Sequence, residues 1–215
     1  MTRPVSADGV TLVGGGELSA ADLEQARAIA PLLVAADGGA DRARDLGHQP
    51  DWIIGDLDSL TGAARASVPP SRLLHVAEQD STDFVKCLTR IDARFVLAVG
   101  FAGGRVDHTL AAMTALVSTD ARVLMLTGDD VIFAAPPELR LDVTAGTRVS
   151  LFPMGPATGT STGLEWPIDG LTLTPAGQIG TSNRATGPVS LTMNGPLLVI
   201  LARDCLGAVM AGLNL

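Results

Sequence analysis

The chain has 215 residues, of which 47% are hydrophobic and 18% are charged, and its formal net charge is −8 with a pI near 4.7. This hydrophobic content supports a folded core and excludes a disordered chain. The acidic balance argues against a general nucleic-acid surface, which needs a basic stripe, so we expect no nucleic-acid partner.

The first part of the chain alternates short apolar segments with helical patterns. Strands are predicted, in chain order, at 10–13, 32–36, 52–54, 73–76, 95–99 and 122–126. Helices are predicted from about Ser19, which is a plausible N-cap, from 40 to 46, from the segment that opens at Asp80, and from 106 to 117. Continuous apolar strands that alternate with helices predict a parallel sheet covered on both faces.

The pattern changes near Ala135-Pro136-Pro137. Beyond it, short strands are predicted between Gly, Pro and Asn turns at 148–152, 163–166, 171–173, 179–181, 189–193 and 197–201, with no convincing helical period. We therefore predict an α/β chain with two domains. Residues 1–135 form a Rossmann-like parallel α/β sheet domain, and residues 136–215 form a small all-β sandwich.

Four of the predicted strands end in segments rich in glycine and aspartate, namely 14–16, 37–39, 55–59 and 100–107. Ligands of open parallel sheets bind beyond the carboxyl ends of the strands. These segments therefore predict a shared ligand edge. The first of them matches neither the dinucleotide fingerprint nor a Walker loop.

Asp56 and Asp58 stand two residues apart after a predicted strand. On an extended chain such residues share a face, about 6.6 Å apart at Cα, so their carboxylates can converge on one Mg²⁺. The alternative is an aspartate-rich turn in which Asp58 or Ser59 caps the next helix.

The only lysine of the chain is Lys86. With Asp80 and Asp83 it has the spacing i, i+3, i+6, which places the three on one side of a helix start. Two acids and an amine at a ligand edge suit a metal and a polyphosphate together. The alternative is structural: Ser81 or Thr82 caps the helix, and Lys86 lies on a solvated face.

Glycine precedes a charged cluster at residues 103–108. Gly104 allows a close backbone approach, and Arg105 is suited to bidentate phosphate binding. Asp107 can bind a ribose hydroxyl or orient Arg105, while His108 is expected to cap or pack rather than to act as a base.

The second domain offers two further candidates, Trp166 and the polar triplet Thr181-Ser182-Asn183. A core tryptophan and an ordinary turn are the structural alternatives. The two cysteines, Cys87 and Cys205, follow no metal-binding spacing, and we expect Cys87 to be buried by packing. With no signal peptide and no membrane-spanning stretch in the sequence, we expect a cytoplasmic protein with no membrane partner.

Taken together and in order, these segments resemble the thiamine pyrophosphokinase family. The matching residues are 36–40, 50–59, 80–86, 103–108, 163–167 and 181–183. The resemblance implies an enzyme that transfers the pyrophosphoryl group of ATP to the hydroxyethyl oxygen of thiamine, giving thiamine diphosphate and AMP. It also implies Mg²⁺ and a homodimer with sites near the interface.

The same resemblance assigns roles to residues. It implies an ATP- and Mg²⁺-binding first domain and a thiamine-binding second domain. It implies metal ligands at Asp56, Asp58 and Asp83 and catalytic phosphate binders at Lys86 and Arg105. It implies ATP contacts at Asp37, Gly38, Gly39, Gly104, Arg105, Asp107 and His108, and thiamine contacts at Trp166, Ser182 and Asn183. Because the chain has no tyrosine, Trp166 is expected to carry more of the stacking on thiamine.

The sequence motifs leave two alternative functions open. Residues 53–59 superficially resemble the strand and D-x-D-x-[ST] motif of haloacid-dehalogenase-like phosphatases. That motif normally follows the first strand directly, whereas two predicted strands precede it here. The other rival is a non-catalytic sensor of a nucleotide or of thiamine, against which the acidic set and Lys86 argue.

Overall fold

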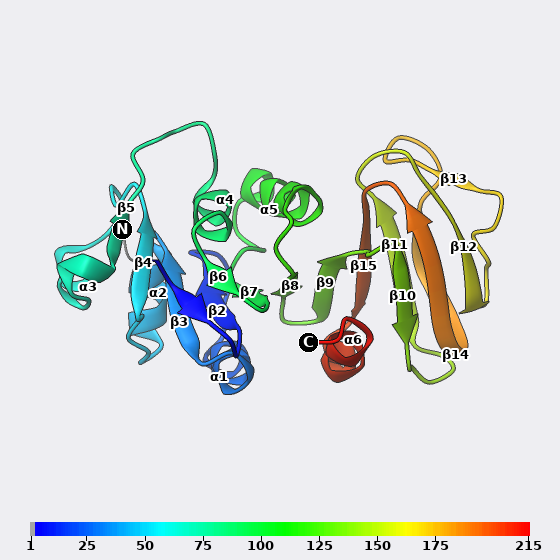
Figure 1. Ribbon diagram of the computed structural model, residues 1–215, viewed down its shortest axis with the longest axis horizontal. Helices are drawn as coiled ribbons and strands as arrows, with labels where there is room; N and C mark the ends of the chain where they lie inside the picture. Colours follow the sequence, from blue (N-terminus) through cyan, green and yellow to red (C-terminus); the bar gives the residue numbers. More distant parts are fainter. Residues whose placement is uncertain (1–2) are drawn as a thin grey trace. The chain divides into compact units, whose positions relative to one another are not determined.

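The structure is a computed structural model that describes residues 3–215 (Figure 1). Contacts divide the chain into two compact units, one ending at Gly128 and one running from Asp129 to Leu215. No helix in the described part of the chain has the length and apolar character needed to cross a membrane. The predicted division at residue 135 and the separate roles of two domains stay predictions.

Two sets of three parallel strands form the main part of the first unit. One set pairs in the order β3 (Leu32–Ala36), β4 (Trp52–Gly55), β5 (Leu73–His75). The other pairs in the order β2 (Val10–Val13), β7 (Val96–Val99), β8 (Val123–Leu126). Strands β2 and β3 lie side by side, and a short parallel pair joins β1 (Val5–Ser6) to β6 (Asp92–Ala93).

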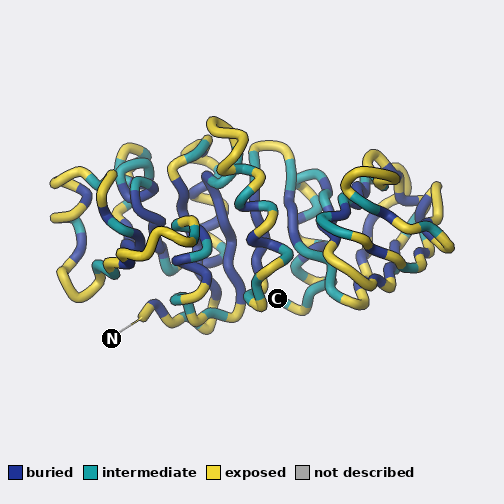
Figure 2. Tube along the Cα trace, turned by 90° about the horizontal axis from the view of Figure 1, so that it is seen from above, coloured by how far each residue is buried: buried dark blue, intermediate teal, exposed yellow. Residues whose placement is uncertain are grey.

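The sequence accounts for this arrangement. Every residue of β2, β4, β7 and β8 is buried, as expected for apolar strands covered on both faces. Figure 2 shows buried segments running through the interior, with exposed residues gathered on the outer turns. The predicted strands of this unit are therefore confirmed, within one or two residues at their ends.

Helices connect these strands, and side-chain caps mark the starts of α1, α3 and α4. They are α1 (Ala20–Ile29), α2 (Gly39–Asp45), α3 (Gly62–Ala66), the 3₁₀ turn η1 (Pro70–Arg72), α4 (Asp83–Leu88) and α5 (Val106–Ser118). The side chains of Ser19 and Thr82 accept the capping hydrogen bonds of α1 and α4, as predicted. Thr61 caps α3, so the alternative in which Asp58 or Ser59 caps the next helix is wrong.

The second unit consists mainly of antiparallel strands. They are β9 (Asp130–Ala134), β10 (Glu138–Leu141), β11 (Arg148–Pro153), β12 (Ala157–Leu164), β13 (Thr172–Leu173), β14 (Gly180–Asn194) and β15 (Leu197–Ala202). The first part of β14 pairs with β11, and its later part pairs with β10 and β12. The two strands predicted at 179–181 and 189–193 are therefore one long strand.

A helix ends the second unit, which contradicts the prediction of an all-β C-terminal part. After the 3₁₀ turn η2 (Arg203–Cys205), helix α6 (Leu206–Gly212) packs against β10 and buries Leu206 and Val209. These two buried residues are three positions apart, so the helix shows only one apolar i, i+3 pair. A helix of seven residues is too short to give a clear period in the sequence.

Candidate functional site

A cavity of about 610 Å³ lies at the carboxyl ends of the strands of the first unit. The glycine- and aspartate-rich segments that follow β2, β3, β4 and β7 all contribute to its wall, together with the start of α4 and of α5. Its lining includes Gly14, Gly15, Gly16, Asp37, Gly38, Gly39, Asp56, Asp83, Lys86, Gly104, Arg105 and His108. The chain thus brings most residues of the predicted ATP and metal sets to one place.

Lys86 lies in the wall of this cavity and is buried. It stands in α4, is only 2% exposed, and its Nζ lies 3.0 Å from Oδ2 of Asp56 and 3.0 Å from Oδ1 of Asp83. A buried ammonium is tolerated only when it is paired and hydrogen-bonded. The alternative of a solvated helix face is therefore wrong.

The ion pairs shift the pKa values of all three groups. The hydrogen bond from Lys86 lowers the pKa of Asp56 to about 2. Burial works against the charged form of Lys86, but the two carboxylates outweigh it and raise the pKa of the ammonium. Burial raises the pKa of Asp83, and Lys86 offsets only part of that rise. At neutral pH the Asp56–Lys86 pair is therefore ionised.

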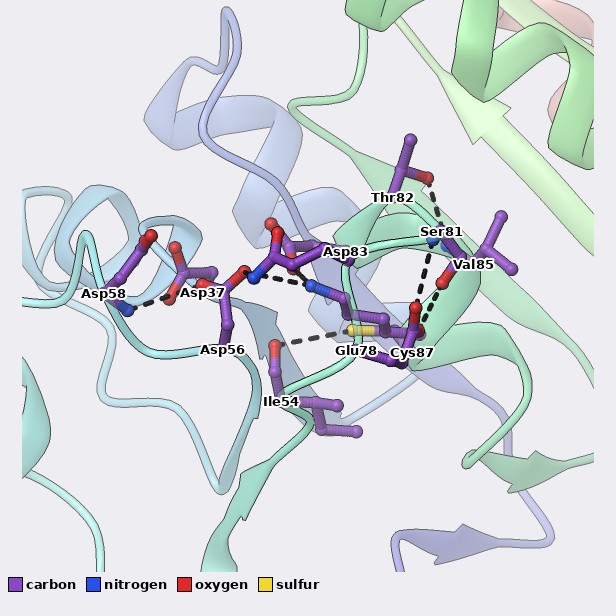
Figure 3. A network of polar contacts seen from close by, with 12 residues as sticks. Asp37, Ile54, Asp56, Asp58, Glu78, Ser81, Thr82, Asp83, Val85 and Cys87 are labelled. Atoms are coloured by element: carbon purple, nitrogen blue, oxygen red, sulfur yellow. Dashed lines mark hydrogen bonds and ion pairs between the residues drawn. The ribbon is translucent and has the colours of Figure 1, made fainter.

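A second acidic group lies on the other side of Asp56. Carboxylate oxygens of Asp37, Asp56 and Asp58 lie within 4.8 Å of one another, and Figure 3 shows the three side chains gathered together. The hydrogen bond and negative charge of Asp56 raise the pKa of Asp58. Asp83 does not belong to this group, because Lys86 stands between it and Asp56.

The backbone around these carboxylates is not the extended strand that the sequence suggested. Strand β4 ends at Gly55, and Leu57 has φ 64°, so the chain turns between Asp56 and Asp58. Asp37 has φ 41°. Left-handed conformations are uncommon for residues other than glycine and gather at functional sites. Leu57 packs into the core with Ile53 and Ala64, which anchors the turn.

Arg105 and Asp107 pair at the start of α5. The Arg105 Nε and Nη2 donate to Oδ1 and Oδ2 of Asp107 at 3.1 and 2.6 Å. Both side chains are exposed, and each favours the charged form of the other, so the pKa of Arg105 is raised and that of Asp107 is lowered. Of the two roles open for Asp107, the orientation of Arg105 is the one that this contact supports.

Sequence reasoning gave no functional role to several residues at the cavity. Ser59 Oγ donates to Oδ2 of Asp37, and Gln79 Nε2 donates to Oδ2 of Asp56 at 3.1 Å. The rings of Phe84 and Phe101 have centroids 4.2 Å apart, and both line the cavity. Ser59 lies within the segment that carries Asp56 and Asp58, which was a usable signal, whereas nothing in the sequence marks Gln79 or Phe101.

Asp80 does not share a helix face with Asp83 and Lys86. Helix α4 begins at Asp83 with Thr82 as its cap, and Asp80 is exposed before it. Cys87 is buried, as predicted, with its Sγ 3.8 Å from the carbonyl oxygen of Ile54. Burial raises the pKa of this thiol, so it packs rather than reacts.

In the second unit, Asn183 holds the backbone of Trp166. Asn183 is buried; its Oδ1 accepts from the Trp166 N–H at 3.2 Å, and its Nδ2 donates to the Trp166 carbonyl at 2.7 Å. The Trp166 side chain is 54% exposed, so the alternative of a core tryptophan is wrong. Ser182 has φ 60°, and its N–H donates to Ser150 Oγ at 3.0 Å.

A parallel α/β unit with an acidic, glycine-lined cavity at its strand ends is typical of enzymes that bind phosphorylated ligands. The model of the family described as "Thiamin pyrophosphokinase, catalytic domain" matches residues 23–126, and the model described as "Thiamin pyrophosphokinase, vitamin B1 binding domain" matches residues 138–198. "Thiamine pyrophosphokinase 1" of Oryza sativa subsp. japonica is 30% identical over 189 residues, which cover 72% of each chain. The chain therefore belongs to the thiamine pyrophosphokinase family, as its motifs predicted.

Solved structures agree on the fold. Thiamin pyrophosphokinase from Candida albicans aligns with a TM-score of 0.76 and 16% identity, covering 93% of both chains. Thiamine pyrophosphokinase from Bacillus subtilis aligns with a TM-score of 0.71 and 22% identity, covering 90% of this chain and 98% of that chain. The chain is an α/β protein of mixed sheet structure like these proteins.

Proposed function

We propose that this chain is a thiamine diphosphokinase, which transfers the pyrophosphoryl group of ATP to the hydroxyethyl oxygen of thiamine and releases thiamine diphosphate and AMP. The observation that carries the proposal is the ordered match of two family models. The catalytic model falls on the unit with the acidic cavity, and the vitamin B1 binding model falls on the strand-rich unit.

The proposed chemistry is an in-line displacement at the β-phosphorus. The hydroxyethyl oxygen of thiamine forms a bond to that phosphorus, the bond from it to the oxygen that bridges to the α-phosphate breaks, and AMP leaves with the electron pair. Such reactions depend on positioning and on stabilising charge rather than on covalent chemistry by the protein. The hydroxyl proton must pass to a base, and Asp58 and Asp83, whose pKa values are raised, are the candidates.

Lys86 and Arg105 are proposed to bind the phosphates. An ammonium has three N–H donors, and two of those of Lys86 go to Asp56 and Asp83. The third is available to one phosphate oxygen. Arg105 lies at the rim with its guanidinium already oriented by Asp107, which suits it to bind a phosphate with two parallel hydrogen bonds.

The residues present fit Mg²⁺. Carboxylate oxygens that converge within 4.8 Å are the donors this hard cation prefers, and their mutual repulsion calls for a positive charge. Asp56 and Asp58 would hold it; Asp83, the third predicted ligand, reaches this space only across the amine of Lys86. When bound, Mg²⁺ neutralises negative charge on the ATP phosphates.

The remaining assignments follow the family motifs. ATP contacts are proposed at Asp37, Gly38, Gly39, Gly104 and His108, with Asp107 orienting Arg105, and thiamine contacts at Trp166 and Ser182. For Asn183 we propose positioning of Trp166, since its amide is bound to the Trp166 backbone. We also infer a Rossmann-like first domain, a β-sandwich second domain, and a cytoplasmic homodimer with sites near the interface.

A product assay tests the proposal. Purified protein is incubated with thiamine, ATP and Mg²⁺, and the products are separated by chromatography. We expect thiamine diphosphate and AMP in equal amounts. Asp56→Asn should abolish turnover while the fold survives, because Lys86 keeps its contact with Asp83. Near-normal activity of Asp56→Asn at limiting metal would contradict the metal assignment.

A further inference from the structure

An aromatic pair ties the start of α4 to the loop that follows β7. The ring centroids of Phe84 and Phe101 lie 4.2 Å apart at an interplanar angle of 34°. Phe84 is 3% exposed and stands in α4 between Asp83 and Lys86. Phe101 lies in the loop between β7 and α5, and both rings line the cavity. The proposed displacement at phosphorus gives neither ring a role.

The loop that carries Phe101 is fixed to the loop that follows β2. Gly16 N–H donates to the carbonyl of Gly100 at 2.7 Å, and Glu17 N–H donates to that of Ala102 at 3.0 Å. The two backbones are in direct contact, because a Cβ at Gly16 would lie 2.7 Å from both of these carbonyl oxygens. The Phe101 ring therefore projects from a backbone whose position is set by the paired strands β2 and β7.

The Phe101 ring is held from two sides. A Cβ at Gly14 would lie 2.9 Å from the Cδ1 and Cε1 atoms of this ring, and Phe84 contacts the ring from α4. Nucleotide bases stack on aromatic rings that present an open face. A ring packed between Gly14 and Phe84 is suited to support α4 rather than to stack on a base.

Helix α4 depends on such contacts for its position. It has six residues, and isolated helices shorter than about 12 residues are marginal in water. Its Cys87 packs against β4, with Sγ 3.8 Å from the Ile54 carbonyl oxygen, while Phe84 packs against Phe101. Lys86 follows Phe84 by two residues in the same helix. A displacement of Phe84 therefore moves the amine of Lys86.

We propose that Phe101 is a positioning residue for phosphate binding. It acts through Phe84 on the first turn of α4 and keeps the third N–H of Lys86 directed into the cavity. The proposal rests on the proposed function for the identity of the phosphate ligand as ATP. Binding of a polyphosphate to the cavity can be measured without thiamine and without turnover.

The test measures binding of inorganic tripolyphosphate, with Mg²⁺ present, by isothermal titration calorimetry. This probe has no base and no ribose, so a ring that stacked on adenine would not affect its binding. We expect Phe101→Leu to weaken tripolyphosphate binding by about tenfold, the equivalent of one hydrogen bond between charged groups. Phe84→Leu should have the same effect, and the double variant should bind no more weakly than either single variant, because the two rings act as one unit.

Phe95→Leu is the matched control. Phe95 directly precedes β7, is 4% exposed, and lies against Gly9, where a Cβ would be 2.5 Å from the ring Cζ. Phe95→Leu and Phe101→Leu each remove a packed ring from one end of the same strand, so both should lower stability in urea. Only Phe101→Leu should weaken tripolyphosphate binding and lower kcat/KM for ATP, with KM for thiamine unchanged.

A second comparison tests the path through Lys86. A Lys86→Met background lacks the N–H donor, so Phe101→Leu should cause no further loss of tripolyphosphate binding there. A further several-fold loss would overturn the proposal. So would wild-type tripolyphosphate affinity in a folded Phe101→Leu variant, an equal loss in Phe95→Leu, or no tripolyphosphate binding by wild type. Circular dichroism identifies a variant that fails to fold, and Phe84→Leu then decides in its place.

The product assay separates this proposal from the proposed function. Thiamine diphosphate formation by wild type with unchanged tripolyphosphate binding in Phe101→Leu rejects the positioning role alone. Tripolyphosphate binding that is weakened in Phe101→Leu and not in Phe95→Leu, without product from wild type, rejects the proposed function alone.

Discussion

The Nζ of Lys86 lies 3.0 Å from Oδ2 of Asp56, thirty positions earlier in the chain. This contact joins helix α4 to the turn that follows β4. It fixes the only ammonium of a lysine side chain in the protein beside the acidic group formed by Asp37, Asp56 and Asp58. Lys86 thus lies between Asp83 on one side and Asp56, the nearest member of the acidic group, on the other.

Lys86→Arg should impair both rate and stability. Lys86 is 2% exposed, so the larger guanidinium must displace packed neighbours, at a cost of about 1–3 kcal/mol of the free energy of unfolding. It also cannot reproduce the compact contact of an ammonium with two carboxylates. Urea unfolding and kcat measure the two effects. Unchanged kcat and stability would show that the position does not require the compact ammonium of lysine.

The Asp56–Lys86 pair also predicts a pH dependence. The folded pKa of Asp56, about 2, lies below its ordinary value of 3.8, so the pair stabilises the fold above about pH 3.8. That stabilisation is lost as the pH falls toward 2. The Lys86→Met variant removes the partner of Asp56. The difference in unfolding free energy between wild type and this variant should therefore become smaller as the pH falls from 5 to 2.5. The measurement uses metal-free protein. A free-energy difference that does not change with pH would contradict a stabilising Asp56–Lys86 ion pair.

Gly14 and Gly15 form a matched pair at the cavity. A Cβ at Gly14 would lie 2.5 Å from the carbonyl oxygen of Gly100 and 2.9 Å from the Phe101 ring, whereas a Cβ at Gly15 meets nothing within 4 Å. Gly14→Ala should therefore lower stability by about 1–3 kcal/mol, and Gly15→Ala should not. Thermal unfolding measures both. Equal melting temperatures for the two variants would contradict the close approach of these loops.

Trp166 and Asn183 should separate substrate binding from stability. Trp166→Ala removes an exposed side chain, so stability should change by less than about 0.5 kcal/mol while KM for thiamine rises. Asn183→Ala leaves the Trp166 backbone groups and the Arg184 N–H without their partner, which should cost about 1–3 kcal/mol. Steady-state kinetics and urea unfolding distinguish the two variants. A Trp166→Ala variant with unchanged KM would remove Trp166 from the thiamine site.

The sequence predicted the first unit well because its strands are continuous apolar runs and its helix caps are local. It could not predict that β14 is one strand, since Gly187 and Pro188 interrupt the pattern and pairing with three neighbouring strands overrides them. Nor could it predict the burial of Lys86, because a lysine in a short helix looks solvated from composition alone.

Tertiary structure also decides which carboxylates form the acidic group. Asp37 follows β3 and Asp56 follows β4, and the two meet because these strands pair in parallel with Ala36 opposite Ile54. The family resemblance implied Asp83 as the third metal ligand instead. Strand order, which brings Asp37 beside Asp56, cannot be read from local spacing.

The central claim is attack on the β-phosphorus of ATP by thiamine. It is tested most directly with ATP radiolabelled at the β-phosphorus and, in a separate reaction, at the α-phosphorus, followed by separation of the products. The account predicts that the β label enters thiamine diphosphate and that the α label leaves as AMP. A β label recovered in ADP would mean transfer of the terminal phosphoryl group alone and would contradict the account.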